Sequence, residues 1–353
     1  MLKIGGTIGI LGGGQLARML AVAASRIGYQ THIYDPNPDS PAFDVASSKT
    51  IGSFQDKDLL KEFAKKIDLA TFEFENVPDA SLKEIENIVS IFPTRNALSI
   101  SQDRIKEKQF FNNLNLKTVQ YAPVDTFEDF SASIAQIKIP SILKTCRQGY
   151  DGKGQLLITK NTTKREIEKH LLLGPCILES FIDFNKEVSV VLSRNQSGHV
   201  VSFDPGENIH RAGILQRTII PAQIPKMVQI DLIIIAGKII NALEYVGVLG
   251  VETFLSHQNE IIINEIAPRV HNSGHWTQNG CAIDQFEQHI RAISGRKLGD
   301  GERHSDVTMV NILGNEIDDS LNVSNAALHL YGKKEIREGR KMGHINYISK
   351  KTS

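Results

Sequence analysis

The sequence has no excess of charge of either sign. Lysine and arginine together number 40, aspartate and glutamate together also number 40, and the formal net charge is zero. Nucleic-acid-binding proteins usually carry a positive excess because they neutralise backbone phosphates. The balance therefore argues against a nucleic-acid partner, although it leaves room for a local basic pocket that binds a small phosphate compound.

Cysteine and long apolar runs are scarce as well. The sequence has three cysteines, Cys146, Cys176 and Cys281. Because they are widely spaced and odd in number, they predict no metal motif and no complete set of disulfides, and they favour a reducing, cytoplasmic location. The glycine-rich N-terminus does not resemble a signal peptide. Charged residues interrupt the most apolar stretch, 230–243, so no membrane segment is expected.

Strands and helices alternate in the first third of the chain. A buried strand is expected at 7–11, a helix at 15–28, a second strand at 31–35 and a further strand at 68–75. This strand–helix–strand order is typical of a parallel α/β sheet. The length of 353 residues suggests two or three domains in all.

The pattern changes after Pro123. Residues 187–203 contain two apolar stretches around an Asn-Gln-Ser-Gly turn, and residues 249–266 form a second predicted hairpin, so this part is expected to be antiparallel α+β. Short strands are expected after Ser305. We predict an N-terminal Rossmann-like domain, two central subdomains and a small C-terminal domain, at 1–115, 116–180, 181–300 and 301–353.

A glycine turn follows the first predicted strand. Gly12, Gly14 and Ala17 form a Gly-x-Gly-x-x-Ala motif that opens a helix, and Asp35 ends the next strand. In dinucleotide-binding folds this arrangement holds the pyrophosphate and a ribose hydroxyl. The motif alone favours a nicotinamide-dependent oxidoreductase, and the alternative is a tight strand-to-helix turn without a ligand.

A second glycine-rich segment, RQGYDGKGQ at 147–155, connects two short predicted strands. Its glycines make the loop deformable, so backbone N–H groups together with Arg147, Lys153 and the preceding Lys144 can surround a polyphosphate. The segment lacks the Gly-x-x-x-x-Gly-Lys-Ser/Thr pattern of a Walker-type loop. The alternative is a hairpin loop with solvated charges.

Two acidic residues occupy the second hairpin. If Ser256 pairs with Ile261 around a four-residue loop, Glu252 faces Glu265 on one side of the sheet. Two close carboxylates repel each other, and Mg²⁺ relieves that repulsion because it favours carboxylate and phosphate oxygens. Asn264 points to the other face unless a bulge follows. The alternative, two solvated acids, fits poorly with the apolar residues on either side.

Polar side chains continue directly after this hairpin, in PRVHNSGH. The Arg269 guanidinium suits a carboxylate, carbonate or phosphate, and His271 and Asn272 add donors and acceptors. A cationic run lies further along, at 331–344, and it contains Lys333, Lys334, Arg337, Arg340 and Lys341. A solvated face and a binding site for a substrate phosphate explain this run equally well.

Several blocks of the sequence, taken in order, resemble the ATP-grasp superfamily and, within it, the N5-carboxyaminoimidazole ribonucleotide synthetase family of purine biosynthesis. The blocks are GILGGGQLARML, KTCRQGYDGKGQ, ENIHRAGIL, NEIAPRVHNSGHWTQNG and EGRKMGHIN. The resemblance implies a three-domain ATP-grasp fold, in which 116–180 is a lid subdomain and 181–300 the main subdomain. Its central domain is expected to close over ATP.

The resemblance also implies an ATP-dependent carbon–nitrogen ligase. The implied reaction converts ATP, bicarbonate and 5-aminoimidazole ribonucleotide, through carboxyphosphate, to N5-carboxyaminoimidazole ribonucleotide, ADP and phosphate. Because carboxyphosphate hydrolyses readily, the site must exclude water, and the glycine-rich loop is expected to act as a lid. A nicotinamide oxidoreductase and a non-catalytic nucleotide sensor are the alternative functions.

The same resemblance implies roles for individual residues. Glu252 and Glu265 match Mg²⁺ ligands. The positions that match ATP-binding residues are Arg104, Lys144, Gly149, Tyr150, Asp151, Gly152, Lys153, Gly154, Gln155, Glu179, Ser180, Phe181, Ile182, Glu187, His210, Asn264 and Glu265. The positions that match the binding of ribonucleotide and bicarbonate are Gln15, Glu73, Tyr150, Asp151, Arg269, His271, Asn272, Lys333 and Arg340. Catalytic positions are matched by Lys153, Arg269, His271 and Asn272.

The chain departs from the family pattern in three places. Lys153 stands where some members carry arginine, and Glu207 stands where relatives place a histidine, so either Glu207 or His210 meets the nucleotide. Many relatives continue beyond the final GHINYISKKTS with helical residues. Either the last domain is smaller here, or the tail is not needed. The resemblance implies a cytoplasmic homodimer that acts on small molecules.

Overall fold

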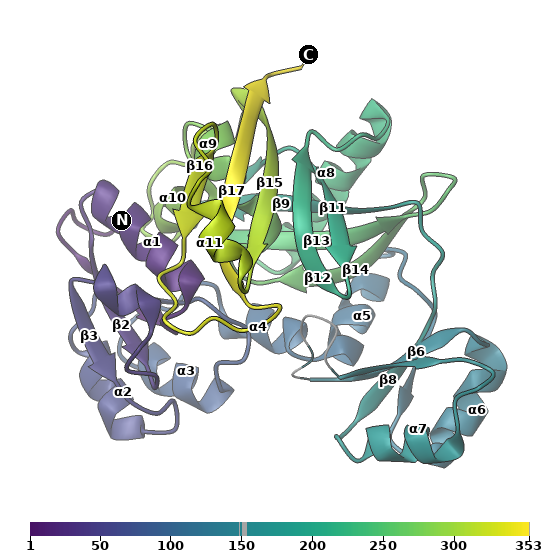
Figure 1. Ribbon diagram of the computed structural model, residues 1–353. Coiled ribbons are helices and arrows are strands. Elements are labelled where there is room, and N and C mark those ends of the chain that lie inside the picture. The colour runs from purple at the N-terminus through teal and green to yellow at the C-terminus, as the bar shows by residue number, and fades with distance from the viewer. Residues whose placement is uncertain (148, 150–153, 353) are drawn as a thin grey trace.

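The computed structural model describes residues 1–147, 149 and 154–352. In this part of the chain, the strands form three sheets, of four, nine and four strands. Figure 1 shows the N-terminal sheet and its helices on one side of the large sheet, and the smallest α/β unit, with β6 and β8, projecting on the other side. The order of parallel and then antiparallel sheets confirms the predicted fold class.

The N-terminal sheet is entirely parallel and follows the order β3-β2-β1-β4. Its strands are β1 (Thr7–Leu11), β2 (Gln30–Asp35), β3 (Ser48–Ile51) and β4 (Leu69–Phe72). Its helices are α1 (Gln15–Arg26), α2 (Lys57–Ala64), α3 (Asp79–Glu86) and α4 (Arg95–Ser101), with a 3-10 turn η1 (Pro41–Asp44). The strand predicted at 68–75 is shorter than expected because the chain turns after Phe72 and brings Glu73 to the start of α1.

The smallest unit is an antiparallel sheet with two helices, in the order β5-β8-β6-β7. Its elements are β5 (Tyr121–Val124), α6 (Phe127–Ile137), β6 (Ser141–Thr145), β7 (Gln155–Ile158), α7 (Lys164–Leu171) and β8 (Cys176–Ser180). Both helices begin with a capping box, in which Thr126 and Thr163 accept from the backbone three residues on. The helix α5 (Arg104–Asn113) leads into this unit.

The large sheet contains nine strands in the described part of the chain. They are β9 (Lys186–Arg194), β10 (Val200–Ser202), β11 (Gly206–Arg211), β12 (Ile214–Ile220), β13 (Gly247–Leu255), β14 (Ile261–Ala267), β15 (Ser305–Leu313), β16 (Ala327–Leu330) and β17 (Lys341–Lys350). The order is β14-β13-β9-β11-β12-β15-β17-β16, and β10 pairs with β9. Both predicted hairpins are present, as β9–β10 and β13–β14.

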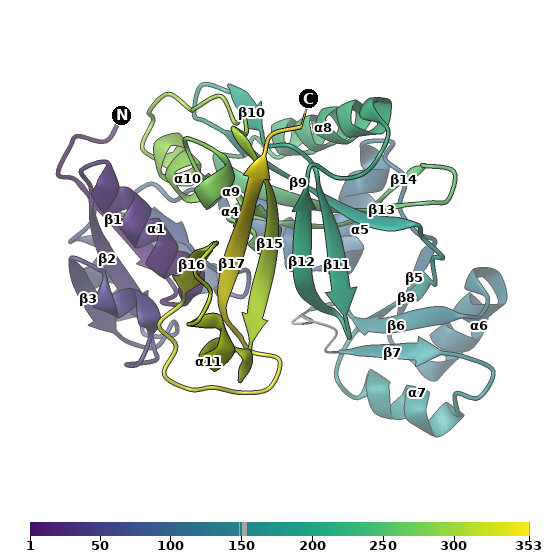
Figure 2. The ribbon, with the colours of Figure 1, turned by 45° about the horizontal axis from the view of Figure 1, so that its top comes forward.

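The last fifty residues differ from the expectation of short strands. β15 has nine residues and β17 has ten, and β15 pairs with β12, so the C-terminal strands extend the large sheet. Figure 2 shows β15 and β17 running beside β11 and β12. The domain boundaries near 115, 180 and 300 remain a prediction.

The helices that pack on the large sheet are α8 (Lys226–Ala242), α9 (Thr277–Gly280), α10 (Gln285–Ile293) and α11 (Glu316–Ser320), with a 3-10 turn η2 (Asn272–Gly274). An apolar core joins α8 to β9 and β13 through buried residues such as Leu232, Ile239 and Val190. A second core joins α1 and α10, so the N-terminal unit is packed on the large sheet. Within the described residues, no helix has the length and apolar character needed to cross a membrane.

Candidate functional site

Glu252 and Glu265 pair directly across β13 and β14, as predicted, but for a different reason. The strands begin with Leu255 opposite Ile261, so the predicted pairing of Ser256 with Ile261 is wrong. A bulge then inserts Asn264 as an extra residue between the pairs Thr253–Ile263 and Glu252–Glu265. The longer loop and the bulge offset each other, and the two acids end opposite one another.

Each of these two acids lies beside a basic side chain. The His271 Nε2 atom lies 3.1 Å from Glu252 Oε1, and the Arg104 Nη1 atom donates to Glu265 Oε2 at 3.0 Å. Burial disfavours the ionised carboxylate of Glu252, but His271 and His210 outweigh that effect and hold its pKa below the ordinary value. Among the described residues, no group of three or more His, Cys, Asp and Glu side chains gathers around one point.

The His271 ring has a partner at both ring nitrogens: Nε2 contacts Glu252, and Nδ1 is 2.8 Å from Ser273 Oγ. Its backbone N–H also donates to Gln285 Oε1 at 2.8 Å. Arg269, two residues earlier, pairs with Glu75 at 2.5 Å and donates to the Val270 carbonyl. Burial would lower the pKa of Arg269, but Glu75 together with the nearby Glu73 and Glu252 raises it. The structure therefore brings Arg269 and His271 close to Glu252, which faces Glu265.

Asn272 has a different environment. Its amide exchanges two hydrogen bonds with Asn311: Asn272 Nδ2 donates at 3.0 Å and Asn311 Nδ2 donates back at 2.8 Å. The Asn272 carbonyl oxygen and one of its N–H groups are thus engaged within the protein. Its predicted catalytic role stays a prediction.

Lys144 and Glu179 form a buried ion pair with Nζ 2.5 Å from Oε2, and Lys108 lies 3.6 Å from the other Glu179 oxygen. Burial lowers the pKa of Lys144, and Glu179 offsets part of this change. Burial also opposes ionisation of Glu179, but the two lysines outweigh it and lower its pKa to about 2. Both oxygens of the Glu179 carboxylate therefore lie next to a lysine ammonium group.

Ser180 to Ile182 connect the small sheet to β9. Ser180 ends β8, and the Phe181 N–H donates to the Pro140 carbonyl at 3.2 Å. Beyond this connection, Glu187 on β9 forms an ion pair with His210 on β11. Burial would lower the pKa of His210, but Glu187 more than compensates and raises it.

Glu207 is the second residue of β11, and its partner is not the Glu187 that pairs with His210. The Lys186 ammonium donates to Glu207 at 2.6 Å. Its carboxylate is thereby paired within the large sheet. His210 therefore pairs with Glu187 and Glu207 pairs with Lys186, and which of the two meets the nucleotide stays a prediction.

The glycine turn before α1 is filled by protein carboxylates. Glu73 accepts from the N–H groups of Gly14 at 2.7 Å and Ala17 at 3.1 Å, and Asp35 accepts from Gly13 at 2.7 Å. A Cβ atom at Gly14 would lie 2.5 Å from Glu73 Oε1, so a larger residue there would displace the Glu73 carboxylate. These carboxylates occupy N–H groups that a pyrophosphate would otherwise need, which favours the alternative of a strand-to-helix turn without a dinucleotide.

Gln15 is the first residue of α1 and follows this turn. The cationic segment between β16 and β17 approaches the same unit, since Lys334 pairs with Asp39 at 2.5 Å. Within that segment, Lys333 donates to the Lys341 carbonyl and Arg340 donates to the Glu335 carbonyl. The cationic segment at 331–344 therefore contacts the N-terminal unit through Lys334.

Part of the predicted phosphate loop lies outside the described residues, namely Tyr150, Asp151, Gly152 and Lys153. On the near side, the Gly149 carbonyl accepts from Arg104 at 3.4 Å. On the far side, the Gly154 carbonyl accepts from Thr145, and Gln155 starts β7.

Two charged residues near Glu265 were not predicted. Glu107 and Lys108 on α5 are each 2% exposed, and both bond to the backbone of β14. Burial and the nearby Glu265 raise the pKa of Glu107 to about 8. Their helical spacing from Arg104, three and four residues, was the signal available in the sequence.

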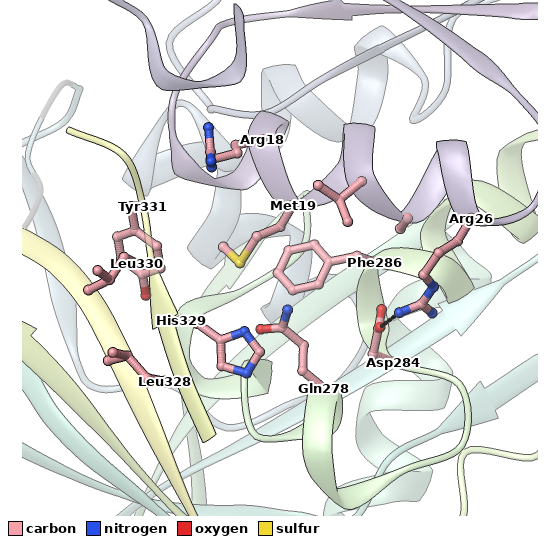
Figure 3. A pocket seen from close by; sticks show the side chains of 12 residues that line it. Arg18, Met19, Arg26, Gln278, Asp284, Phe286, Leu328, His329, Leu330 and Tyr331 are labelled. Carbon is pink, nitrogen blue, oxygen red and sulfur yellow. Dashed lines mark hydrogen bonds and ion pairs between the residues drawn. The ribbon is translucent and has the colours of Figure 1, made fainter. Parts of the chain in front are cut away.

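A separate cavity of about 270 Å³ lies between α1 and β16. Figure 3 shows Met19, Phe286 and Leu328 around it, with Arg26 beside Asp284. Arg26 pairs with Asp284 at 3.2 Å. Within the described part of the chain, none of the predicted site residues lines this cavity. We assign it no role in the site.

Three protein families match consecutive parts of the chain. They are the ribonucleotide synthetase preATP-grasp domain at 6–102, the ATP-grasp domain at 109–286 and the phosphoribosylaminoimidazole carboxylase C-terminal domain at 307–353. Together they divide the chain in the order expected from the resemblance.

Individual relatives agree with these families. The N5-carboxyaminoimidazole ribonucleotide synthase of Brucella melitensis is 45% identical, covering 99% of this chain and 98% of the relative. The Staphylococcus aureus synthetase structure complexed with ADP is 35% identical with a TM-score of 0.95, covering 99% and 94%. The Aspergillus clavatus synthase, solved with ADP and 5-aminoimidazole ribonucleotide, is 29% identical with a TM-score of 0.91, covering 98% and 94%. The chain belongs to the N5-carboxyaminoimidazole ribonucleotide synthase family of ATP-grasp enzymes.

Proposed function

We propose that the chain uses ATP and bicarbonate to carboxylate the exocyclic amine of 5-aminoimidazole ribonucleotide. The products are N5-carboxyaminoimidazole ribonucleotide, ADP and phosphate, in a step of purine biosynthesis. One observation carries the proposal: Glu252 and Glu265 face each other across β13 and β14, with His271 in contact with Glu252 and Arg269 nearby, in a chain of this family. This combination offers hard oxygen ligands beside cationic groups for small acids.

Mg²⁺ fits the pair of opposed carboxylates. Glu252 and Glu265 are direct cross-strand partners, and two carboxylates together with phosphate oxygens form a ligand set that this ion favours. When bound, the ion would neutralise charge on the terminal phosphates of ATP. Arg104 would share that task, since it already pairs with Glu265.

The nucleotide would lie between the small sheet and the large sheet. Lys144 and Arg104 carry the positive charge for the phosphates, together with the loop at 149–155. Glu187 would accept from a ribose hydroxyl, and His210 would hold Glu187 in place through their ion pair. Because lysines occupy the Glu179 side chain, the backbone of 179–182 would meet the base. Asn264, next to Glu265 in the chain, would lie near the phosphates.

Bicarbonate would bind beside Arg269 and His271, with Asn272 close in the chain. Bicarbonate is a poor electrophile, and transfer of the terminal phosphoryl group would convert it to carboxyphosphate. The Arg269 guanidinium would offset the negative charge on the carboxyl oxygens while the carboxyl group is transferred to the amine. The His271 ring is held at Nδ1 by Ser273, which leaves Nε2 directed at Glu252.

The ribonucleotide would span the N-terminal and C-terminal units. Gln15 and Glu73 lie at the start of α1, and Lys333 and Arg340 would bind the 5′-phosphate from the β16–β17 segment. The pair Lys334–Asp39 supports this proposal because it draws that segment towards the N-terminal unit. Tyr150, Asp151, Gly152 and Lys153 are proposed to meet the same substrates on the strength of the family resemblance.

Omission assays test the reaction directly. Purified protein is supplied with ATP, Mg²⁺, bicarbonate and 5-aminoimidazole ribonucleotide, and ADP release is followed by a coupled assay. We expect ADP release only when all four are present. Folded protein that releases ADP at the same rate without bicarbonate would contradict the proposal.

We further propose that the chain acts as a homodimer in the cytoplasm. The chain mass is 39.1 kDa, so light scattering on a sizing column would give about twice this mass for a dimer. A mass near that of a single chain at micromolar concentration would rule the dimer out.

A further inference from the structure

The strand that carries Glu265 lies at the edge of the large sheet. β14 is first in the strand order, so among the described residues the outer side of its backbone has no neighbouring strand of that sheet, apart from an isolated bridge between Ile263 and Thr118. Edge backbone groups need other partners when they are buried. The bulge at Asn264 adds to this demand because it interrupts the ladder with β13 directly before Glu265.

Two adjacent side chains of α5 satisfy the backbone on either side of Glu265. The Lys108 ammonium donates to the Asn264 carbonyl at 2.7 Å. The Glu107 carboxylate accepts from the Ile266 N–H at 2.8 Å. One residue supplies the donor and its neighbour supplies the acceptor, so the peptide groups before and after Glu265 are both fixed.

The same helix also holds the Glu265 side chain. Arg104 lies one turn before Glu107 and donates to Glu265 Oε2 at 3.0 Å. Residues three and four apart share one face of a helix, so Arg104, Glu107 and Lys108 act from a single surface. Figures 1 and 2 both place α5 next to β14.

The position of α5 is itself fixed at its start. Asp103 caps the helix by accepting from the N–H groups of Ile105 and Lys106. The Arg104 N–H donates to the Cys146 carbonyl at 3.0 Å, at the end of β6. The helix is therefore a rigid link between the phosphate-loop strands and β14.

Burying these polar side chains is costly unless their polar atoms are hydrogen-bonded. Glu107 and Lys108 are each 2% exposed, and apolar side chains at such positions usually give an equal or more stable fold. An apolar helix face would, however, leave the Asn264 carbonyl and the Ile266 N–H without these two partners. The donor on Lys108 and the acceptor on Glu107 thus stabilise one particular backbone geometry at the bulge.

We propose that Glu107 and Lys108 are positioning residues for Glu265: they clamp the bulge so that the Glu265 carboxylate stays opposite Glu252. This inference rests on the proposed function, in which these two acids bind Mg²⁺. The partners of a metal ligand commonly control metal affinity even though they do not touch the ion. Glu107 and Lys108 act through the backbone of that ligand.

The test compares variants on the same helix. Lys108→Met and Glu107→Leu each remove one half of the clamp, and Glu107→Gln retains an oxygen that accepts from Ile266. Lys106→Met is the matched control, because Lys106 is exposed on the neighbouring position of α5. Thermal unfolding checks that each variant folds, and Lys108→Gln, whose amide is too short to reach the carbonyl, replaces Lys108→Met if that variant does not.

Two measurements are made on the intact chain. The first is the Mg²⁺ concentration that gives half-maximal ADP release at saturating ATP, bicarbonate and ribonucleotide. The second is the ATP affinity with and without Mg²⁺, by calorimetry. We expect Lys108→Met and Glu107→Leu to require about 10-fold more Mg²⁺ and to lose the Mg²⁺-dependent part of ATP affinity. Glu107→Gln should recover most of this loss, and Lys106→Met should match the wild type.

Wild-type Mg²⁺ dependence in both folded clamp variants would overturn the inference. An equal loss of ATP affinity with and without Mg²⁺ would also overturn it, because a merely structural role gives that result. The variant Glu265→Gln distinguishes the proposed metal role of Glu265 from the proposed clamp. If Glu265→Gln leaves Mg²⁺ dependence unchanged, the proposed metal role fails; if it changes Mg²⁺ dependence and the clamp variants do not, only the clamp fails.

Discussion

Glu252 and Glu265 face each other across an antiparallel pair of strands, and a single extra residue, Asn264, sets that register. Without the bulge, the pairing that begins at Leu255 and Ile261 would place Asn264 opposite Glu252. The chain thus uses a local irregularity to bring two carboxylates together. Such an arrangement is unfavourable by itself, and it is offset here by Arg104 and His271.

Glu265→Gln tests the role of this pair. The substitution keeps the shape of the side chain but removes one negative charge, so we expect turnover to fall at least about 100-fold with little change in thermal stability. Steady-state ADP release measures the effect. Glu260→Gln, in the loop of the same hairpin, is the control and should retain wild-type turnover. A wild-type rate for Glu265→Gln would remove Glu265 from the site.

Arg340→Ala tests the proposed 5′-phosphate site. Loss of one charged hydrogen-bond donor to a phosphate weakens binding by about 1.5–3 kcal/mol, so the KM for the ribonucleotide should rise roughly 10- to 100-fold. The KM for ATP should stay the same. Arg337→Ala, on the same segment, is the control, because the Arg337 side chain is 67% exposed and that of Arg340 only 33%. If the KM for ATP rose instead, Arg340 would not be a binder of the ribonucleotide 5′-phosphate.

The role of Glu73 in the glycine turn predicts a change in stability. In Glu73→Gln the amide nitrogen cannot accept a hydrogen bond, so either Gly14 or Ala17 loses a partner for its N–H. We expect the free energy of unfolding to fall by about 1–3 kcal/mol in urea titrations. Glu86→Gln, which removes an exposed partner of Arg95, should change it little. Equal stability of the wild type and Glu73→Gln would show that the turn does not depend on this acid.

His289 predicts how stability depends on pH. Its Nδ1 atom accepts from the Val248 N–H and its Nε2 atom contacts Thr71, so the buried ring is neutral in the fold. Burial lowers its pKa from 6.5 to about 3. The unfolded chain therefore binds a proton that the folded chain does not, and stability falls as pH drops from about 6.5 towards 3.

The slope contributed by His289 is up to about 1.4 kcal/mol per pH unit in that window. Urea unfolding at several pH values should show a shallower slope for His289→Gln than for the wild type. His304→Gln, which alters an exposed histidine, should keep the wild-type slope. Parallel slopes for the wild type and His289→Gln would contradict the assignment of a neutral buried ring.

The sequence predicted those parts of the site that lie close together in the chain. Alternating apolar residues located both hairpins, and the short distance from Glu265 to Arg269 and His271 placed the polar cluster correctly. The glycine turn was ambiguous because its pattern does not reveal whether a ligand or a protein carboxylate fills it. Glu73, which fills it, lies 59 residues after Gly14.

Contacts between distant segments could not be predicted. Lys108 meets Asn264 across 156 residues of sequence, and Glu107 meets Ile266 across 159. Their charges looked like an ordinary helix surface because nothing local indicates which face is buried. The hairpin loop length was also misjudged, since a bulge has no clear signature in Ile-Ile-Ile-Asn-Glu.

Oxygen labelling tests the central reaction most directly. With ¹⁸O-labelled bicarbonate, a bicarbonate oxygen attacks the terminal phosphorus of ATP, and the carbon–oxygen bond then breaks as the carboxyl group moves to the amine. The account predicts that the released phosphate carries one ¹⁸O from bicarbonate, as detected by ³¹P NMR. Phosphate that contains no oxygen from bicarbonate, although ADP and carboxylated product form, would contradict it.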